Sequence, residues 1–343
     1  MADYQFVHPQ FKLNGFSFTK DDLCRVAYAY IKEGDDYEKA IGLFLLNWFD
    51  ESLTIQVTTS GTTGPPKKIT INKQAMLASA AATSTYFKLA PGIHALLCLS
   101  VQFIAGKMML VRAMQGGWQL DVVKPSVSPI KNRAKPYDFV AMIPMQVSQS
   151  LKQIKQIKTL LIGGAPLSNR LRDQLVELEV QAYESYGMTE TITHIAVKSI
   201  HEPNFNALPG VSFALNENQC LRISAPRIST DAIQTNDIVD LIDAKQFRFL
   251  GRIDTVINSG GIKLFPELIE QKLAAQLPQR FYIIGKPNEE WGEQALLVIE
   301  SAPYVLPANV FDCLNKYEKP KEIIFLPHFQ ETASGKIIRK LPD

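Results

Sequence analysis

Residues 58–68 constrain this chain more than any other stretch, and they read Thr-Thr-Ser-Gly-Thr-Thr-Gly-Pro-Pro-Lys-Lys. The two glycines allow backbone N–H groups to turn toward one point, while the hydroxyls and a lysine add donors and positive charge. This inventory predicts a loop that holds a polyphosphate. Its spacing differs from that of the Walker loop, because two prolines follow Gly64. A solvated linker would explain the composition but not the order. The predicted phosphate ligands are Thr59, Ser60, Gly61, Thr62, Thr63, Gly64 and Lys67.

The length of 343 residues suggests two domains or three. Lys and Arg number 36 against 34 Asp and Glu, so the net charge of +2 gives no reason to expect nucleic acid or an anionic membrane as a partner. Four widely separated cysteines argue against a zinc site and a disulfide scaffold. The first residues lack a secretory signal pattern, and no stretch approaches the roughly 20 apolar residues that span a bilayer. We therefore expect a cytoplasmic enzyme or binding protein without a membrane span.

Apolar periodicity predicts an α/β fold. Residues 53–58 alternate apolar and polar side chains, as a strand that enters the phosphate loop would. Asn72 is a suitable N-cap for a helix over 73–88, and the apolar stretch 38–49 predicts a buried helix. From about 93 to 199, strand-like runs alternate with helical patterns. We expect strands at 95–99, 139–143, 159–162 and 180–185, and helices at 102–114, 147–157 and 168–179.

The pattern changes after about residue 208 to short β-like runs separated by Asn, Asp and Gly. These runs predict a small β subdomain. A helix is expected to begin near Pro266, since proline is favourable in a first turn. We expect a domain boundary there, which gives a large domain over 1–252 and a small α+β domain over 253–343. The expected elements are strands at 221–224, 238–242, 247–250, 281–286 and 294–300 and a helix at about 307–317.

Two turns follow predicted strands, where ligands of α/β proteins collect. Residues 163–167 carry little side-chain bulk, so a flat ring could lie against their backbone. Residues 183–191 place an aromatic ring, a glycine, a hydroxyl and a carboxylate close together. The alternative for this second turn is a packed tyrosine beside a surface carboxylate.

Five segments form one pattern when they are taken together: 60–67, 186–190, 235–237, 251–254 and 335–339. In residue type and order they resemble the motifs of the adenylate-forming superfamily, which includes acyl-CoA synthetases, peptide-synthetase adenylation domains and luciferases. The resemblance extends from about residue 53 to the end of the chain. It implies a large N-terminal α/β domain with a β subdomain, followed by a small mobile α+β domain.

The resemblance implies a site for adenine and ribose. Tyr186 would stack on the adenine, with Gly187 beside it. Asp237 would accept hydrogen bonds from the ribose hydroxyls, and Arg252 would be a second ribose ligand. The family has glycine where this chain has Asn236, and asparagine tolerates the left-handed backbone that glycine supplies. The adenine-recognition turn would be Gly163, Gly164 and Ala165.

Catalytic and conformational roles are also implied. Thr189 would donate to the α-phosphate, and Glu190 would help to hold Mg²⁺, a role that suits a hard carboxylate beside polyphosphate. Lys336 would be the catalytic lysine, although a solvated lysine in a basic tail is the commoner fate of this residue type. Asp254 would be the hinge about which the small domain rotates, and Gly261 would line the channel for the pantetheine of coenzyme A.

These roles imply ligation of a small carboxylic acid to coenzyme A. A carboxylate oxygen attacks the α-phosphorus of Mg-ATP, pyrophosphate leaves, and a thiol then attacks the acyl adenylate. Charges fixed in advance around the reacting groups would stabilise the first step. ATP, Mg²⁺ and coenzyme A are the expected cofactor and co-substrates.

Two departures from the family pattern bear on the acid. Only residues 1–57 precede the loop, so we expect a simplified wall on the acyl side. Many acyl-CoA ligases have His-x-x-Gly where this chain has Phe103-Ile-Ala-Gly106, so the ring would gate the acyl pocket without proton chemistry. The pocket is expected from 103–109 and 185–193, with His194. Compact members resemble the o-succinylbenzoate-CoA ligases of menaquinone biosynthesis, which predicts an aromatic keto-dicarboxylic acid as substrate.

Two other interpretations remain open. The chain could be another aryl-CoA or acyl-CoA ligase, or an adenylation enzyme that loads a carrier protein, with the same ATP residues and a different pocket. It could also be a nucleotide-binding regulator without turnover, although the retention of Lys336, Glu190 and Lys67 speaks against this. The sequence leaves a homo-oligomer open.

Overall fold

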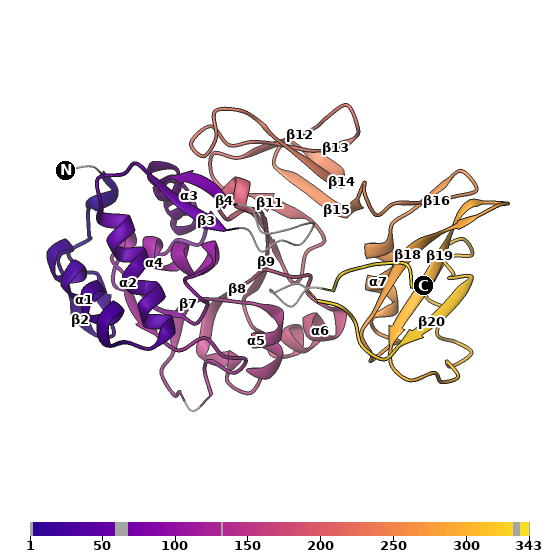
Figure 1. The fold of residues 1–343 in the computed structure, drawn as a ribbon, viewed down its shortest axis with the longest axis horizontal. Coiled ribbons are helices and arrows are strands. Elements are labelled where there is room, and N and C mark those ends of the chain that lie inside the picture. Colours follow the sequence, from indigo (N-terminus) through magenta and orange to yellow (C-terminus); the bar gives the residue numbers. More distant parts are fainter. Residues whose placement is uncertain (1–2, 59–67, 132, 332–336, 343) are drawn as a thin grey trace.

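The computed structural model describes residues 3–58, 68–131, 133–331 and 337–342 (Figure 1). Within these residues the strands form sheets of 13, five and two strands. The five-stranded sheet is built from residues beyond 256 and lies to one side of the rest of the molecule (Figure 1). No helix in the described ranges is long and apolar enough to cross a membrane.

Two packed helices dominate the N-terminal segment. The predicted helix over 38–49 is confirmed as α2 (Asp36–Phe49), and its buried side includes Phe44 and Trp48. Leu43 is an exception to the expected burial, since 55% of it is exposed. The preceding helix α1 was not expected from the sequence. The elements before α2 are η1 (Asp3–Gln5), β1 (Lys12–Leu13), β2 (Phe16–Ser17) and α1 (Lys20–Glu33).

A two-stranded hairpin flanks the predicted phosphate loop. Strand β3 (Thr54–Thr58) matches the expected strand, and it pairs antiparallel with β4 (Lys68–Asn72), which was not expected. The expected helix follows as α3 (Lys73–Tyr86), and the Asn72 side chain accepts from two backbone N–H groups of its first turn. The predicted phosphate ligands between β3 and β4 lie outside the described residues.

Parallel strands form one half of the 13-stranded sheet, as the alternating pattern predicted. The hydrogen-bonded order is β9–β8–β7–β5–β6–β1, and β2 adds an antiparallel edge. Apolar side chains from this half fill two buried clusters. The elements are β5 (His94–Leu97), α4 (Ile104–Gly116), β6 (Gln119–Val122), β7 (Tyr137–Met142), α5 (Pro144–Gln149), η2 (Ile154–Gln156), β8 (Ile157–Ile162), α6 (Asn169–Glu177) and β9 (Ala182–Gly187).

Antiparallel strands form the other half of the same sheet, beginning where β10 pairs with β9. The strands expected at 221–224, 238–242 and 247–250 are all present, and the pairing of β11 with β15 joins them to the large sheet. The elements are η3 (Thr189–Thr191), β10 (His194–Ser199), β11 (Phe205–Ala207), β12 (Ser212–Leu215), β13 (Cys220–Ser224), β14 (Ile233–Asp243) and β15 (Gln246–Arg252).

The remaining residues build an α+β unit with its own buried clusters. The expected helix at Pro266 and both expected strands are confirmed. The elements are β16 (Ile257–Ser259), β17 (Ile262–Leu264), α7 (Pro266–Leu273), β18 (Phe281–Asn288), β19 (Gly292–Glu300) and β20 (Glu322–Leu326).

Two expected helices are wrong. Residues 147–157 contain the end of α5, a series of turns and η2, because Ser150 and Gln153 close three-residue turns instead of continuing an α-helix. Residues 307–317 also form successive turns, in which the N–H groups of Val310 and Leu314 bond to carbonyls three residues back. Both segments still bury apolar side chains. The apolar spacing in the sequence therefore indicated burial correctly but did not indicate an α-helix.

A buried lysine links the β3–β4 hairpin and helix α3 to the N-terminal segment. Lys73, the first residue of α3, is 0% exposed, and its Nζ lies 2.7 Å from Oδ1 of Asp50 at the end of α2. The same ammonium lies 4.5 Å from the centre of the Tyr4 ring. Removing Asp50 would leave the buried ammonium without its anion, although 47% of the Asp50 side chain is exposed and solvent therefore screens the pair.

We expect Asp50→Asn to lower the free energy of unfolding by about 2 kcal/mol, less than for a fully buried pair, because Lys73 loses its anion but solvent already screens the half-exposed Asp50. The control is Asp36→Asn, since Asp36 is fully exposed and its 3.7 Å pair with Lys39 is a surface pair with little effect on stability. Urea denaturation at neutral pH measures both. Equal losses in the two variants would contradict the anchoring role of Lys73.

Candidate active site

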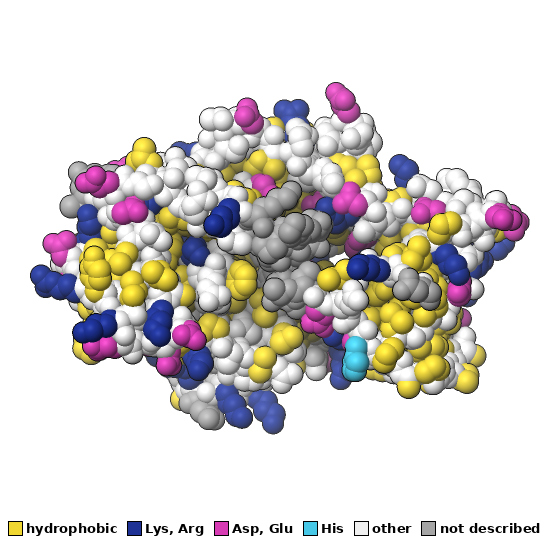
Figure 2. All heavy atoms as spheres, viewed as in Figure 1, with side chains coloured by type: hydrophobic (Ala, Val, Ile, Leu, Met, Phe, Trp, Pro, Cys, Tyr) yellow, Lys and Arg dark blue, Asp and Glu magenta, His cyan; other side chains and the backbone are white. Residues whose placement is uncertain are grey.

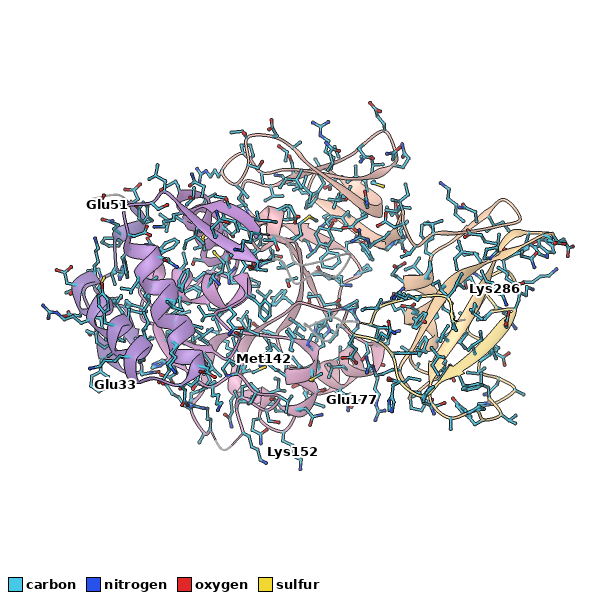
Figure 3. All side chains as sticks on the ribbon, viewed as in Figure 1. Glu33, Glu51, Met142, Lys152, Glu177 and Lys286 are labelled. Atoms are coloured by element: carbon cyan, nitrogen blue, oxygen red, sulfur yellow. The ribbon has the colours of Figure 1, made fainter. Side chains whose placement is uncertain are left out.

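The glycine turn expected to receive adenine follows β8 directly. Gly163 donates its N–H to the Met142 carbonyl, at the end of β7 near the centre of the molecule (Figure 3). A Cβ on Gly163 would lie 2.3 Å from Oγ of Ser185 on β9, and Gly164 has a φ of +86°. Position 164 therefore favours glycine for its backbone conformation, and a side chain at 163 would displace the Ser185 hydroxyl from its bond to the Ile162 carbonyl. The turn is packed against β9 with its backbone bare of side chains.

The second predicted turn leaves β9 at Gly187 and is held by a buried threonine. The Thr191 hydroxyl accepts from the Met188 N–H at 2.9 Å and donates to the Thr193 carbonyl at 2.7 Å. Ile192 has a φ of 68°, which is strained for a β-branched side chain and typical of functional turns. This buried framework leaves Thr189 half-buried and Glu190 exposed.

Tyr186 and Asp237 meet although 51 residues separate them. The Tyr186 hydroxyl donates to Oδ2 of Asp237, and its ring packs against Phe205, Phe247 and Phe249. Burial raises the pKa of Asp237, and the hydrogen bond from Tyr186 acts in the opposite direction. Burial, followed by the charge of Asp237, raises the pKa of Tyr186. The pair is therefore a neutral phenol that supports a carboxylate poor in water contacts.

Arg252 and Asp254 extend this cluster toward the predicted hinge. Strand pairing places Arg252 opposite Asp237, with Nη1 4.0 Å from Oδ1, and Nη2 lies 2.9 Å from Oδ2 of Asp254. The Asn236 amide donates to the other oxygen of Asp254 at 2.9 Å. The expectation of a left-handed Asn236 is wrong, because Asn236 lies within β14 and its φ is not positive. Its side chain holds the predicted hinge carboxylate instead.

Phe103 caps the N-terminal end of α4, and 42% of it is exposed. A Cβ on Gly106 would lie 2.3 Å from the Ser100 carbonyl, so glycine lets the preceding loop fold back on the helix. The Lys107 ammonium donates to the carbonyls of Val101 and Gln102 at 2.6 and 2.8 Å. Burial lowers the pKa of Lys107 to about 8. The loop before α4, which carries Phe103, is thus held by the hydrogen bonds of Lys107 and by its close packing against Gly106.

Arg112 is a residue that the sequence analysis missed. It is 2% exposed, and its Nη2 lies 3.4 Å from Nδ1 of His194 and 3.5 Å from Oγ1 of Thr193. Its Nη1 contacts the Met109 sulfur at 3.9 Å, and its Nε has no described partner. None of the ion pairs in the described ranges includes it, and burial lowers its pKa to about 9. A lone arginine in the apolar run Met-Met-Leu-Val-Arg-Ala-Met was the signal that could have found it.

Several predicted site residues lie apart from the cluster around Asp237 or outside the described residues. Gly261 stands at the turn between β16 and β17 with a φ of +81°. Lys336, like the phosphate ligands, lies outside the described residues. On the face shown in Figure 2, basic and acidic side chains alternate without a field of one sign, in keeping with the near-zero net charge.

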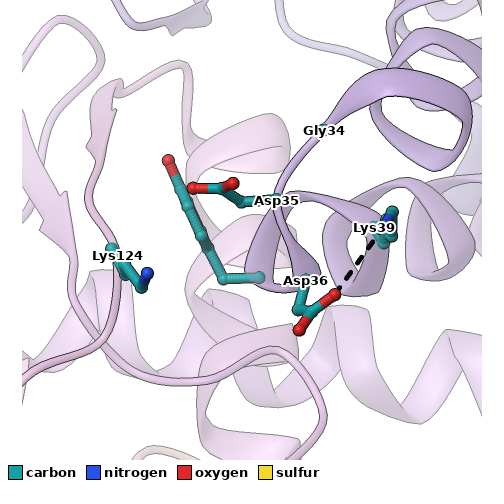
Figure 4. A pocket seen from close by; sticks show the side chains of 6 residues that line it. Gly34, Asp35, Asp36, Lys39 and Lys124 are labelled. Carbon is teal, nitrogen blue, oxygen red and sulfur yellow. Dashed lines mark ion pairs between the residues drawn. The ribbon is translucent and has the colours of Figure 1, made fainter.

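A surface cavity of about 210 Å³ lies elsewhere, at the turn between α1 and α2 (Figure 4). One ion pair, between Asp36 and Lys39, joins two of its lining residues at 3.7 Å. None of the predicted site residues lines it. The full lining is Gly34, Asp35, Asp36, Tyr37, Lys39 and Lys124.

The chain belongs to the AMP-binding enzyme family, whose family model matches residues 50–223. This match confirms the family that the sequence motifs indicated. The order of the elements and the large mixed sheet are those of the adenylate-forming fold, so the expected fold class is confirmed as well.

Three relatives illustrate the similarity. An acyl-CoA synthetase (AMP-forming)/AMP-acid ligase II-like protein from Dyadobacter fermentans is 35% identical, with 91% of this chain and 95% of that chain covered and a TM-score of 0.63. A 2-succinylbenzoate–CoA ligase of Bacillus cytotoxicus is 24% identical over 334 residues, covering 84% of this chain and 69% of the relative. The o-succinylbenzoate coenzyme A synthetase of Bacillus subtilis, in complex with ATP and a magnesium ion, is 19% identical, with 85% and 73% covered and a TM-score of 0.72.

The support that Tyr186 gives to Asp237 should appear as a pH-dependent loss of stability in Tyr186→Phe. At pH 7 the ionised Asp237 loses a donor, at a cost of about 2 kcal/mol. The pKa of this carboxyl is raised in the folded protein, so the cost should shrink as the pH falls through that raised pKa and Asp237 becomes protonated. Urea denaturation at pH 7 and pH 4 measures the change.

Tyr183→Phe is the matched control, since Tyr183 lies on the same strand and its hydroxyl has no described hydrogen bond. A deficit of equal size at both pH values in Tyr186→Phe would show that the hydroxyl does not serve the carboxylate.

Proposed function

We propose that this protein is an ATP-dependent carboxylate–CoA ligase that acts on o-succinylbenzoate. In the first step a carboxylate oxygen bonds to the α-phosphorus of ATP and the bond to the departing pyrophosphate breaks. In the second step the thiol sulfur of coenzyme A bonds to the acyl carbon, AMP leaves, and the thiol proton passes to solvent. The family, the motifs and the names of the relatives agree with this chemistry.

The cluster around Asp237 supports the nucleotide end of this proposal. Asp237 is an acceptor, and Arg252 on the neighbouring strand is a donor, so together they complement ribose hydroxyls. Tyr186 and the turn at Gly163 would lie on either side of the adenine. The backbone of Gly164, Ala165 and Gly187 would approach the nucleotide closely, because these residues have little or no side chain. Thr189 would donate to the α-phosphate.

Glu190 fits a role in holding Mg²⁺ together with the substrate. Its carboxylate is exposed and has no described ion-pair partner, and no cluster of three or more potential metal ligands occurs in the described ranges. Magnesium in proteins commonly uses one or two carboxylates together with phosphate oxygens and water. The ion would neutralise phosphate charge, while the chain supplies Glu190 and the backbone that presents it.

We further propose that 1–252 and 253–343 act as two domains that rotate about Asp254. The two sides have separate buried clusters. Among the described residues few side-chain hydrogen bonds join them, such as that from Asn169 to the Gln271 carbonyl, which is consistent with such a motion. Lys336 would neutralise charge in the adenylation step, and Gly261 would face the pantetheine in the second step. Phe103 and Gly106 would form the entrance for the acid.

Arg112 is the observation that favours a dicarboxylic acid. A buried guanidinium without a carboxylate is costly, and an anionic group of the substrate would compensate for it. Arg112 lies seven residues after Ala105, so both share one face of α4, with Met109 between them. Ala105 is exposed whereas Met109 and Arg112 are buried, so burial increases along this face toward the guanidinium, and a methionine is a side chain that can adapt to a ligand. o-Succinylbenzoate has two carboxylates, one to be activated and one to be held.

The direct test is AMP release by the purified protein with Mg-ATP, coenzyme A and o-succinylbenzoate, with benzoate, a fatty acid and amino acids in parallel. We expect turnover with o-succinylbenzoate that is lost in Lys336→Ala and kept in Lys340→Ala, a neighbouring exposed lysine. Turnover with another acid alone would keep the chemistry and reject the substrate. No turnover with any of these acids would reject the ligase in favour of a carrier-loading enzyme or a nucleotide-binding regulator.

Arg112→Met should raise the KM for o-succinylbenzoate by about 100-fold, the effect of removing a buried charge-assisted contact, and leave the KM for ATP within about threefold. Replacing an uncompensated buried charge with an apolar side chain should leave the melting temperature equal or higher. Steady-state kinetics and thermal unfolding measure the two effects. A destabilised variant with an unchanged KM would mean that Arg112 serves the fold and not the acid.

A further inference from the structure

The hydrogen bonds around Arg112 determine how its neighbours are protonated. A guanidinium has only donors, so Nδ1 of His194, which lies 3.4 Å from Nη2 and 3.4 Å from Oγ1 of Thr193, accepts from the guanidinium when the Thr193 hydroxyl also donates to it. The proton of the imidazole is therefore on Nε2, which lies 3.2 Å from Oγ1 of Thr83 and donates to it. The Thr83 hydroxyl in turn donates to the Ser79 carbonyl at 3.1 Å. One direction of donation thus runs from Arg112 through His194 and Thr83 to the backbone of α3.

His194 is neutral in this arrangement. It is 5% exposed, and burial, followed by the positive charge of Arg112, lowers its pKa well below the ordinary value. An imidazolium would carry a proton on Nδ1 and could not accept from the guanidinium. The charged group that faces His194 in the described ranges is Arg112.

A neutral acceptor orients a cation without cancelling its charge. A carboxylate at position 194 would pair with Arg112 and neutralise it, as Asp50 does for the equally buried Lys73. His194 and Thr193 instead engage only Nη2, so the donors on Nε and Nη1 meet no described acceptor stronger than the Met109 sulfur. Those donors are the ones available to an incoming carboxylate.

We propose that His194 is a positioning residue and a specificity determinant: it holds Arg112 as an oriented, unneutralised cation that selects acids with a second, retained carboxylate. Thr83 fixes the tautomer of His194 from the opposite side. The inference rests on the proposed ligase function. It extends that function from Arg112, which binds the retained carboxylate, to the two residues that keep the guanidinium oriented and unneutralised.

A graded series of substitutions at position 194 tests this inference. His194→Asn keeps an acceptor near Nδ1, His194→Leu removes it, and His194→Asp replaces it with a charge. We expect the KM for o-succinylbenzoate to rise by about threefold, tenfold and 100-fold in that order, with the KM for ATP unchanged. A flat series, or equal changes in the KM for both substrates, would overturn the positioning role.

Two mono-acids make the readout specific. 4-Oxo-4-phenylbutanoate and 2-butanoylbenzoate each lack one carboxylate of o-succinylbenzoate, and whichever is turned over lacks the retained one. With that acid, His194→Leu and His194→Asp should raise the KM far less than they do with o-succinylbenzoate, because Arg112 is no longer used. The same KM rise with the mono-acid would show a merely structural effect. Failure of the wild type with every acid would reject the ligase function and is distinguishable from these outcomes.

An activity-independent readout is the long-range ¹H–¹⁵N spectrum of the imidazoles. The chain has five histidines, and the signal of His194 is identified by its loss in His194→Asn. We expect a proton on Nε2, a bare Nδ1 and no titration between pH 6 and 8. A proton on Nδ1, or titration within that range, would overturn the tautomer assignment on which the inference depends.

Discussion

The hydrogen bond from Tyr186 to Asp237 joins the two halves of the large sheet at the candidate site. Parallel strands deliver Tyr186 at the end of β9, while Asp237 comes from the antiparallel half, opposite Arg252. The carboxyl ends of parallel strands meet at one edge, and the change of direction at β10 brings the second half beside that edge. The site is therefore a consequence of sheet order, since no local segment contains more than a few of its residues.

The treatment of buried positive charge separates structural from functional roles. Lys73 has Asp50, Lys198 shares Glu184 with Arg172, and Arg339 has Glu270 at 2.7 Å. Each of these cations has an anion of the chain beside it, as burial requires. Arg112 is buried as deeply as Lys73 and has neutral neighbours only. Lys107 also lacks an anion, but two backbone carbonyls accept from its ammonium, whereas Nε of Arg112 has no described partner. This difference argues that an acceptor for Arg112 arrives with a ligand.

Much of the fold and part of the site could be predicted from the sequence. Motif order gave the family, and period and capping gave elements such as α3, because Asn72 and the strand before it act locally. The role of Arg112 was not predicted, because it depends on burial against Thr193 and His194, which are about 80 residues away in the chain and cannot be recognised from a local pattern. The role of Asn236 escaped for a related reason, since its partner Asp254 lies 18 residues away on the far side of a hairpin. The predictions of helices at 147–157 and 307–317 were wrong because apolar spacing cannot distinguish an α-helix from a series of buried turns.

Under the proposed function, nucleotide binding and domain rotation share one residue. Arg252 faces Asp237, the proposed ribose acceptor, and also bonds to Asp254, the proposed hinge. Asn236 holds the second oxygen of Asp254, so a rotation that displaces the Asp254 side chain would break or rearrange bonds on both oxygens. If ribose hydroxyls compete for the guanidinium of Arg252, they weaken one of these bonds and lower the barrier to rotation. Arg252 thus connects the proposed ribose site to the proposed hinge through one side chain.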